Sequence, residues 1–182
     1  MQKDSHVDLH PNQIAVCFWY GIVCDEETNA VVGMELPGVN LSGTLSAEIS
    51  ILSELQFIDL SENSIEGEIP LEIKQLPKLR GINLAHNKIH GTLQGFHPSL
   101  SILNVSHNEL DGMLTSDFGD EASYWEVLDA SYNMMGGLLP QSLGKMSILK
   151  VLDLGYNQFY GTIPPSIGEL KELKGLFLND NR

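Results

Sequence analysis

The side chains best suited to chemistry in this chain are two histidines, His86 and His107, two cysteines, Cys17 and Cys24, and an excess of carboxylates. The sequence contains no Gly-rich phosphate loop with Lys, no Gly-x-Ser-x-Gly elbow, no His-Glu-x-x-His motif and no carboxylate pair set apart as acid and base. Six residues separate the cysteines, which is not a usual zinc spacing, and no matching Cys/His pair follows. We therefore expect no catalytic residue, no cofactor and no metal. A metal site on the two histidines is a less favoured alternative, in which the rim would supply Glu66, His90 and Asp111.

The charge of the chain is strongly acidic and unevenly distributed. Its 182 residues include 10 Lys and Arg against 24 Asp and Glu, a formal net charge of −14. From Asp4 to Ile73 there are 13 acidic residues and no Lys or Arg. Nucleic-acid backbones and anionic membranes need clustered basic residues, so both are unexpected partners. The acidic first part predicts a solvated face or, in the sharper alternative, a surface for a cation or a basic partner.

Hydrophobic residues make up 42% of the chain, which is enough for a core. No apolar run is long enough to span a bilayer, and the first residues lack the apolar stretch of a secretory signal. A removed signal, a cytosolic protein and an internal fragment each agree with this observation.

An internal repeat governs where these residues fall. Apolar residues stand five and three positions before each anchor residue, and a glycine stands four positions after each of the first six anchors, from Gly43 to Gly161. Val39 anchors a degenerate first copy. The other anchors recur at intervals of 24, 21, 25, 24 and 24 residues and are Asn63, Asn87, Asn108, Asn133, Asn157 and Asn181.

The repeat predicts its own structure. Alternating apolar and polar residues before the anchor predict a short strand, which buries its apolar side only when copies stack in a parallel sheet. The asparagine amides are expected to bond backbone groups where the chain leaves the strand, forming a ladder through the stack. The glycine is expected in a turn that a side chain would obstruct or that needs a positive φ.

The stretch Leu149 to Pro164, which reads LKVLDLGYNQFYGTIP, resembles the plant-type leucine-rich repeat, and the resemblance covers about residues 17–182. It implies an α/β fold: a right-handed leucine-rich repeat solenoid with a parallel concave β-sheet and a mostly 3-10 or irregular convex side. The third copy is shortened near residues 95–98, and the fourth has one extra residue near 120–122. Trp125 takes the place of a leucine in other copies and is expected in the core.

The segment from Cys17 to Cys24 reads Cys-x-Trp-x-Gly-x-x-Cys and resembles the N-terminal cap of plant-type leucine-rich repeat ectodomains. The resemblance implies a disulfide between these cysteines and a Trp19 that packs on the first coil. A disulfide in turn implies an extracellular or cell-surface location. The glycosylation candidates, Asn40 and Asn104, agree weakly with that location.

Two regions are expected on this basis. Residues 1–31 would form an N-terminal tail and the cap, and residues 32–182 would form seven repeat copies, the last incomplete and without a C-terminal cap. An exposed core end is prone to aggregation, so we expect a truncated product or a fragment.

Side chains beside the apolar strand positions would face the concave surface. The acidic ones are partly explained by the repeat consensus, and adjacent aromatic rings could serve either recognition or cross-strand stability. Because the histidines titrate near neutral pH, acid-dependent binding is a hypothesis. The candidate ligand-binding residues are Glu35, Asp59, Glu62, His86, His107, Tyr132, Met134, Tyr156 and Phe177.

The resemblance implies a non-enzymatic recognition module of an extracellular receptor-like protein, binding a peptide, protein or glycan on the concave face. Any kinase or membrane anchor would lie beyond residue 182. One alternative is a secreted inhibitor of a cell-wall glycosidase, resembling polygalacturonase-inhibiting proteins. Another is a structural or adhesion protein.

Overall fold

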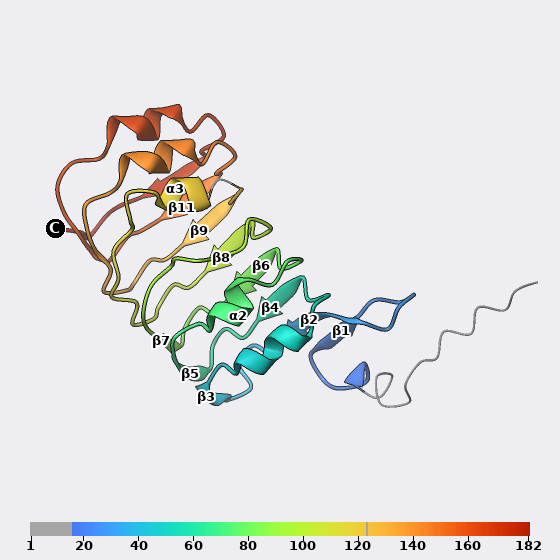
Figure 1. Ribbon diagram of the computed structural model, residues 1–182. Helices are drawn as coiled ribbons and strands as arrows, with labels where there is room; N and C mark the ends of the chain where they lie inside the picture. The colour runs from blue at the N-terminus through green and yellow to red at the C-terminus, as the bar shows by residue number, and fades with distance from the viewer. Residues whose placement is uncertain (1–15, 123) are drawn as a thin grey trace, which may run out of the picture.

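The computed structural model describes residues 16–122 and 124–182, so residues 1–15 of the tail and cap expected over residues 1–31 lie outside the described residues. The main sheet has eight strands in the order β1-β2-β4-β6-β8-β9-β11-β13. β1 pairs antiparallel with β2, and every other neighbouring pair is parallel. Figure 1 shows the coils stacked from the blue N-terminal end to the red C-terminal end. The strands are β1 (Ile22–Cys24), β2 (Val31–Glu35), β4 (Phe57–Asp59), β6 (Gly81–Asn83), β8 (Ile102–Asn104), β9 (Val127–Asp129), β11 (Val151–Asp153) and β13 (Gly175–Phe177).

The inner coils, from β4 to β11, bury alternate side chains of their strands. Leu152 of β11 and Leu154 just after it are fully buried, whereas Asp153 between them is half-buried. Because equivalent residues pair in register from coil to coil, the buried leucines and isoleucines form one continuous core. The chain is therefore the leucine-rich repeat solenoid with a parallel sheet that its sequence predicts.

Short helical turns cover the side of the core opposite the main sheet (Figure 1). Trp125 is buried there, edge-on between the rings of Phe96 and Phe118, which confirms its core position. Three aromatic rings thus fill the convex side where the third copy is shortened. The turns are the 3-10 helices η1 (Ala47–Ile51), η2 (Gln141–Lys145) and η3 (Pro165–Glu169) and the single α-turns α2 (Leu71–Lys74) and α3 (Phe118–Glu121).

Two smaller parallel sheets follow the asparagine turns. One contains β3 (Ser42–Thr44), β5 (Ser64–Gly67) and β7 (Lys88–Ile89), and the other contains β10 (Gly136–Gly137) and β12 (Gln158–Phe159). The repeat glycines have φ between 85° and 91° in five of the six copies. Gly112 is the exception, and a Cβ there would lie 2.9 Å from Cγ2 of Thr92, so lack of space requires the glycine.

The six anchor asparagines connect each coil to the one before it. In Asn133, Oδ1 accepts a hydrogen bond from the backbone N–H of Leu110 at 2.9 Å, and Nδ2 donates to the carbonyl of Val105 at 2.9 Å. The same two kinds of bond recur at the other five anchors. Buried backbone groups that the strands leave unpaired are satisfied in this way. We call these six residues the asparagine ladder.

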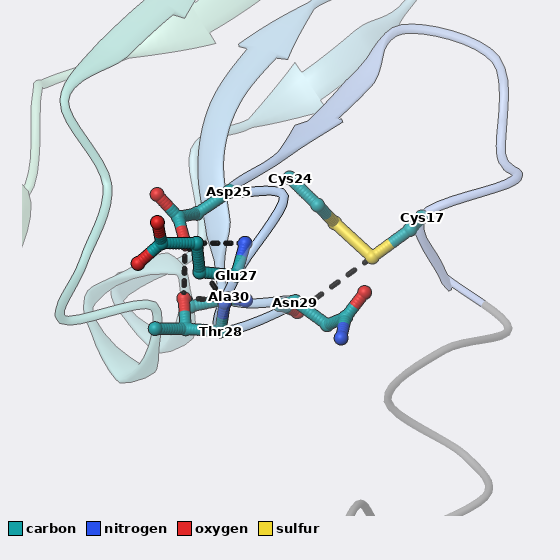
Figure 2. Close-up of a disulfide and its surroundings, with 7 residues drawn as sticks. All are labelled: Cys17, Cys24, Asp25, Glu27, Thr28, Asn29 and Ala30. Carbon is teal, nitrogen blue, oxygen red and sulfur yellow. Dashed lines mark hydrogen bonds between the residues drawn. A yellow bond between two sulfur atoms is a disulfide. The ribbon is translucent and has the colours of Figure 1, made fainter.

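The N-terminal cap contains the disulfide between Cys17 and Cys24 (Figure 2). The disulfide joins the start of the cap to the end of β1, and the sulfur of Cys17 lies 3.6 Å from the carbonyl oxygen of Asn29 in the turn between β1 and β2. Within that turn, Oδ1 of Asp25 accepts hydrogen bonds from the backbone and hydroxyl of Thr28. These bonds, the backbone bond first, lower the pKa of Asp25.

The expected position of Trp19 is wrong. Its side chain is 65% exposed, and the flanking Phe18 and Tyr20 are exposed as well. β1 covers the end of the sheet instead, because its backbone pairs with β2. The cap therefore closes the first coil through main-chain hydrogen bonds rather than through the indole. Among the described residues, no helix is long and apolar enough to cross a membrane.

Candidate functional site

Three columns of side chains run across the concave face, and each takes at most one residue from a coil. The first, the acidic column, lies between the two core-facing positions of each coil, five and three residues before the anchor. The Oδ1 atom of each of its Asp and Asn members from β4 to β11 accepts a hydrogen bond from the backbone N–H two residues later, which fixes its orientation. Its members are Glu35, Asp59, Asn83, Asn104, Asp129, Asp153 and Phe177.

The ring column consists of His86, His107, Tyr132 and Tyr156, each directly before an anchor asparagine. Neighbouring rings stack with centroids 4.1 Å apart and planes within 13° of parallel. All four residues have φ between 53° and 56°, the left-handed region, which costs a non-glycine residue about 1–2 kcal/mol. The sheet holds this strained geometry at every coil, and it sets the rings face to face.

The stacked arrangement decides what the ring column can bind. The inner faces of the rings cover one another, so a ligand meets ring edges and polar tips rather than open ring faces. The two imidazoles are also stacked face to face instead of converging on one point. Among the described residues, no three His, Cys, Asp or Glu side chains gather where they could hold a metal ion.

The surroundings shift the pKa values of several of these groups. Burial, followed by the charge of His86, lowers the pKa of His107 against the opposing effect of Asp129. Hydrogen bonds with Tyr132 and then with Asp180 raise the pKa of Tyr156 to about 12. Burial raises the pKa of Asp153, with a smaller contribution from Asp129 on the neighbouring strand. In the ring column, these shifts favour the neutral forms of the Tyr156 phenol and the His107 imidazole.

The structure does not gather all the predicted binding residues in one place. Glu62 occupies the position of the ring column in the second coil and is exposed, with φ of 56°. Met134 follows Asn133 and leads into the smaller sheet at β10, away from the strands of the main sheet. Phe177 ends the acidic column, and its ring lies over Gly175. Among the described residues, the stacked rings end at Tyr156.

The glycosylation candidates lie in different settings. Asn40 is exposed at the end of the first coil, with φ of 61°. Asn104 is half-buried in β8 within the acidic column, and its Oδ1 accepts hydrogen bonds from the backbone and hydroxyl of Ser106. A glycan on Asn104 would stand on the concave face, whereas one on Asn40 would leave that face open.

Sequence reasoning missed a third column, the apolar column, which lies two residues before the acidic one. Phe57 and Ile102 of this column are 48% and 43% exposed. Strand alternation predicts that these side chains point to the concave face, so the signal was present in the repeat. The members are Gly33, Phe57, Gly81, Ile102, Val127, Val151 and Gly175.

Comparison with known proteins agrees with this architecture. The family model described as Leucine Rich Repeat matches residues 54–76 and 149–170. The chain is 46% identical over 135 residues to the receptor protein-tyrosine kinase CEPR2 of Arabidopsis thaliana, covering 73% of this chain and 14% of that protein. It is 36% identical over 134 residues to MDIS1-interacting receptor like kinase 1 of Arabidopsis thaliana, covering 74% and 11% respectively.

Solved structures give the same result. The Arabidopsis receptor kinase HAESA, in complex with the peptide hormone IDA and the co-receptor SERK1, matches with a TM-score of 0.83 and 31% identity over 97% of this chain. The plant peptide hormone receptor RGFR1, in complex with RGF2, matches with a TM-score of 0.74 and 32% identity over 79% of this chain. The chain is a leucine-rich repeat protein of the plant type. It resembles the ectodomains of plant receptor kinases and spans 29% and 23% of these two solved chains.

Proposed function

We propose that this chain is a non-enzymatic recognition module that binds a peptide or a protein on its concave face, on the extracellular side, as part of a longer receptor-like protein. The observation that carries the proposal is the exposed ring column beside the hydrogen-bonded acidic column on one rigid sheet. Because these side chains are ordered before binding, a ligand loses little free energy in fixing them. The receptors HAESA and RGFR1, solved with peptide hormones, support the same class of ligand.

A peptide fits the concave face better than a glycan. Sugar rings stack on open aromatic faces, and the faces inside the ring column are occupied by neighbouring rings 4.1 Å away. An extended peptide can instead run across the strands, pairing polar groups with the acidic column and contacting the edges of Tyr132 and Tyr156. Those two phenols are each 43% exposed, enough to contribute apolar contact area on binding.

Two other functions would use the same surface. A secreted glycosidase inhibitor would block an enzyme cleft, and an adhesion protein would bind matrix without a discrete ligand. The full reading frame separates the receptor from the inhibitor, because a membrane span after the repeats indicates a receptor, whereas capping cysteines followed by a stop codon indicate an inhibitor.

A binding experiment tests the proposal directly. A combinatorial library of linear peptides is selected against the immobilised chain, and the affinity of each selected peptide is measured by calorimetry. We expect Tyr132→Ala to weaken binding by about tenfold or more, the loss typical of a buried aromatic contact. Tyr124→Ala is the matched control, because Tyr124 is an exposed tyrosine outside the concave columns. Selected peptides whose affinity falls with Tyr124→Ala and not with Tyr132→Ala would overturn the proposal.

A further inference from the structure

The apolar column has a notch where a glycine stands between two exposed apolar side chains. Phe57, Gly81 and Ile102 lie on the adjacent strands β4, β6 and β8 (Figure 1). The backbones of the outer two strands are about 9.6 Å apart, two strand spacings. Because Gly81 has no side chain, the ring of Phe57 leans over it, and Cδ1 of that ring would lie 2.8 Å from an added Cβ. We call this site the Gly81 notch.

The notch is of a size to hold one amino-acid side chain. Its cavity volume is about 240 Å³, and residues of β4, β6 and β8 line it together with Glu35. Pockets for whole small molecules usually start at about 300 Å³ and enclose their ligand, whereas this notch is open to the concave surface. Its walls are apolar at Phe57 and Ile102. A single aliphatic side chain, carried by a chain that continues along the surface, matches this shape.

The charged residues around the notch determine which side chains the peptide can carry next to its aliphatic residue. Glu35 and Asp59 line the notch beside Asn83. Among the described residues, the ion pairs join Lys78 with Glu54, Lys145 with Asp120, and Lys150 with Glu126, so neither lining carboxylate has a basic partner. Ser61 donates two hydrogen bonds to Oδ1 of Asp59, which leaves Oδ2 available to a ligand.

The basic side chain next in sequence to the notch does not fill it. Arg80 directly precedes β6 and lines a different groove, together with Lys78 and Ser101. The lining of the notch itself contains two carboxylates and no basic residue. Its charge therefore favours a cationic ligand.

We propose that the Gly81 notch is a subsite for a basic peptide, which seats one aliphatic side chain between Phe57 and Ile102 and places an adjacent Lys or Arg against Asp59 and Glu35. This inference rests on the proposed function, because it names the class of peptide that the same face takes. It assigns recognition to β4, β6 and β8, at the coils before the tyrosine end of the ring column.

The test uses defined probes and the full chain. Isoleucine methyl groups are labelled for NMR, and the chain is titrated with acetyl-Ala-Arg-Leu-Arg-Ala-amide. Two further probes replace Leu with Gly, or both Arg with Glu. We expect the Leu probe to shift the exposed Ile102 methyl and to bind about tenfold more tightly than the Gly probe, because one aliphatic side chain leaves water. The Glu probe should not bind.

Three variants locate the binding. Gly81→Val, at a position of ordinary backbone conformation, pushes the Phe57 ring aside, because an added Cβ would lie 2.8 Å from Cδ1 of that ring. The valine then occupies the notch and should reduce the affinity of the Leu probe to that of the Gly probe. Gly175→Val is its control, because Gly175 occupies the same column at β13 beside Phe177. Asp59→Asn should lower the affinity of the Leu probe and of the Gly probe, which both contain Arg, by about two- to fivefold. Asn fits this column, as Asn83 shows by making the same bond.

The outcomes separate this inference from the proposed function. Equal affinities of the Leu and Gly probes for the unmodified chain, tight binding of the Glu probe, or no binding at all would overturn the subsite. If the library-selected peptides still depend on Tyr132 in that case, recognition on the concave face stands without the notch. If the Leu probe fills the notch but no selected peptide depends on Tyr132, the subsite stands and the proposed role of the ring column fails.

Discussion

Replacing Asn133 with alanine tests how the asparagine ladder holds the solenoid together. Nδ2 of this side chain donates to the carbonyls of Val105, Ala130 and Ser131, and each of these oxygens keeps a second donor after the substitution. The backbone N–H of Leu110 has no such replacement, because it donates to Oδ1 of Asn133.

The magnitude follows from this count. One buried donor left without a partner costs about 1–3 kcal/mol, and loss of the three shared bonds adds to it, so we expect about 2–4 kcal/mol in the free energy of unfolding. For a chain of this length that change lowers the Tm by about 4–16 °C. Urea unfolding followed by circular dichroism measures the first quantity, and a thermal scan measures the second.

A matched variant makes the reasoning refutable. Asn181 makes equivalent bonds to Phe159 and Leu154 but is only half-buried, so water can replace its side chain. Asn181→Ala should therefore cost less than half as much as Asn133→Ala. Asn133→Asp, although isosteric, should destabilise at least as much as alanine, because it points an oxygen at three carbonyl oxygens. Equal costs at Asn133 and Asn181, or a harmless Asn133→Asp, would refute the reasoning.

Three further predictions concern stability. The pKa of His107 is lowered from 6.5 in the folded chain, so the unfolded chain binds more protons just below that pH, and the free energy of unfolding should fall as the pH drops through 6.5 and level off below the lowered pKa. A pH series of urea unfolding should lose this slope in His107→Gln but keep it in His90→Gln, which lies outside the ring column. Gly119→Ala should lower the free energy of unfolding by about 3 kcal/mol or more, because its Cβ would lie 1.8 Å from a carbonyl oxygen of the next coil. Gly168→Ala, whose Cβ would have nothing within 4 Å, should be neutral or slightly stabilising in the same assay. Reduction of the disulfide should remove about 2–3 kcal/mol from the cap, seen as faster amide exchange in β1 with little change in β9 to β13.

The repeat predicts the fold well because each coil packs the same positions of its repeat into the core. Leu152 and Leu154 are buried and Asp153 is not, as alternation requires, and the anchor asparagines occupy the turns where unpaired backbone groups occur. Trp125 follows the same logic, since its position in the repeat outweighs its residue type. These features depend on residue spacing within one coil and on the repetition of that spacing in the adjacent coils, and both can be read from the sequence.

Other features depend on tertiary context. The cap motif indicates the disulfide but not the exposure of Trp19, which depends on what covers the first coil. The left-handed backbone before each anchor residue carries no residue signature, because glycine, histidine, tyrosine and acidic residues all occupy it. The Gly81 notch requires knowing that Phe57 leans sideways over a glycine on the next strand. Pairing registers supply that information, and the residue types alone do not.

Hydrogen exchange of the chain with and without a library-selected peptide tests the central claim most directly, because it reports which face the ligand covers. Recognition on the concave face predicts slower exchange at the ring column, from His86 to Tyr156, and in the strands β4, β6, β8, β9 and β11. The convex turns η1, η2 and η3 should exchange unchanged. Protection confined to those convex turns, with the ring column and the concave strands unaffected, would contradict the account.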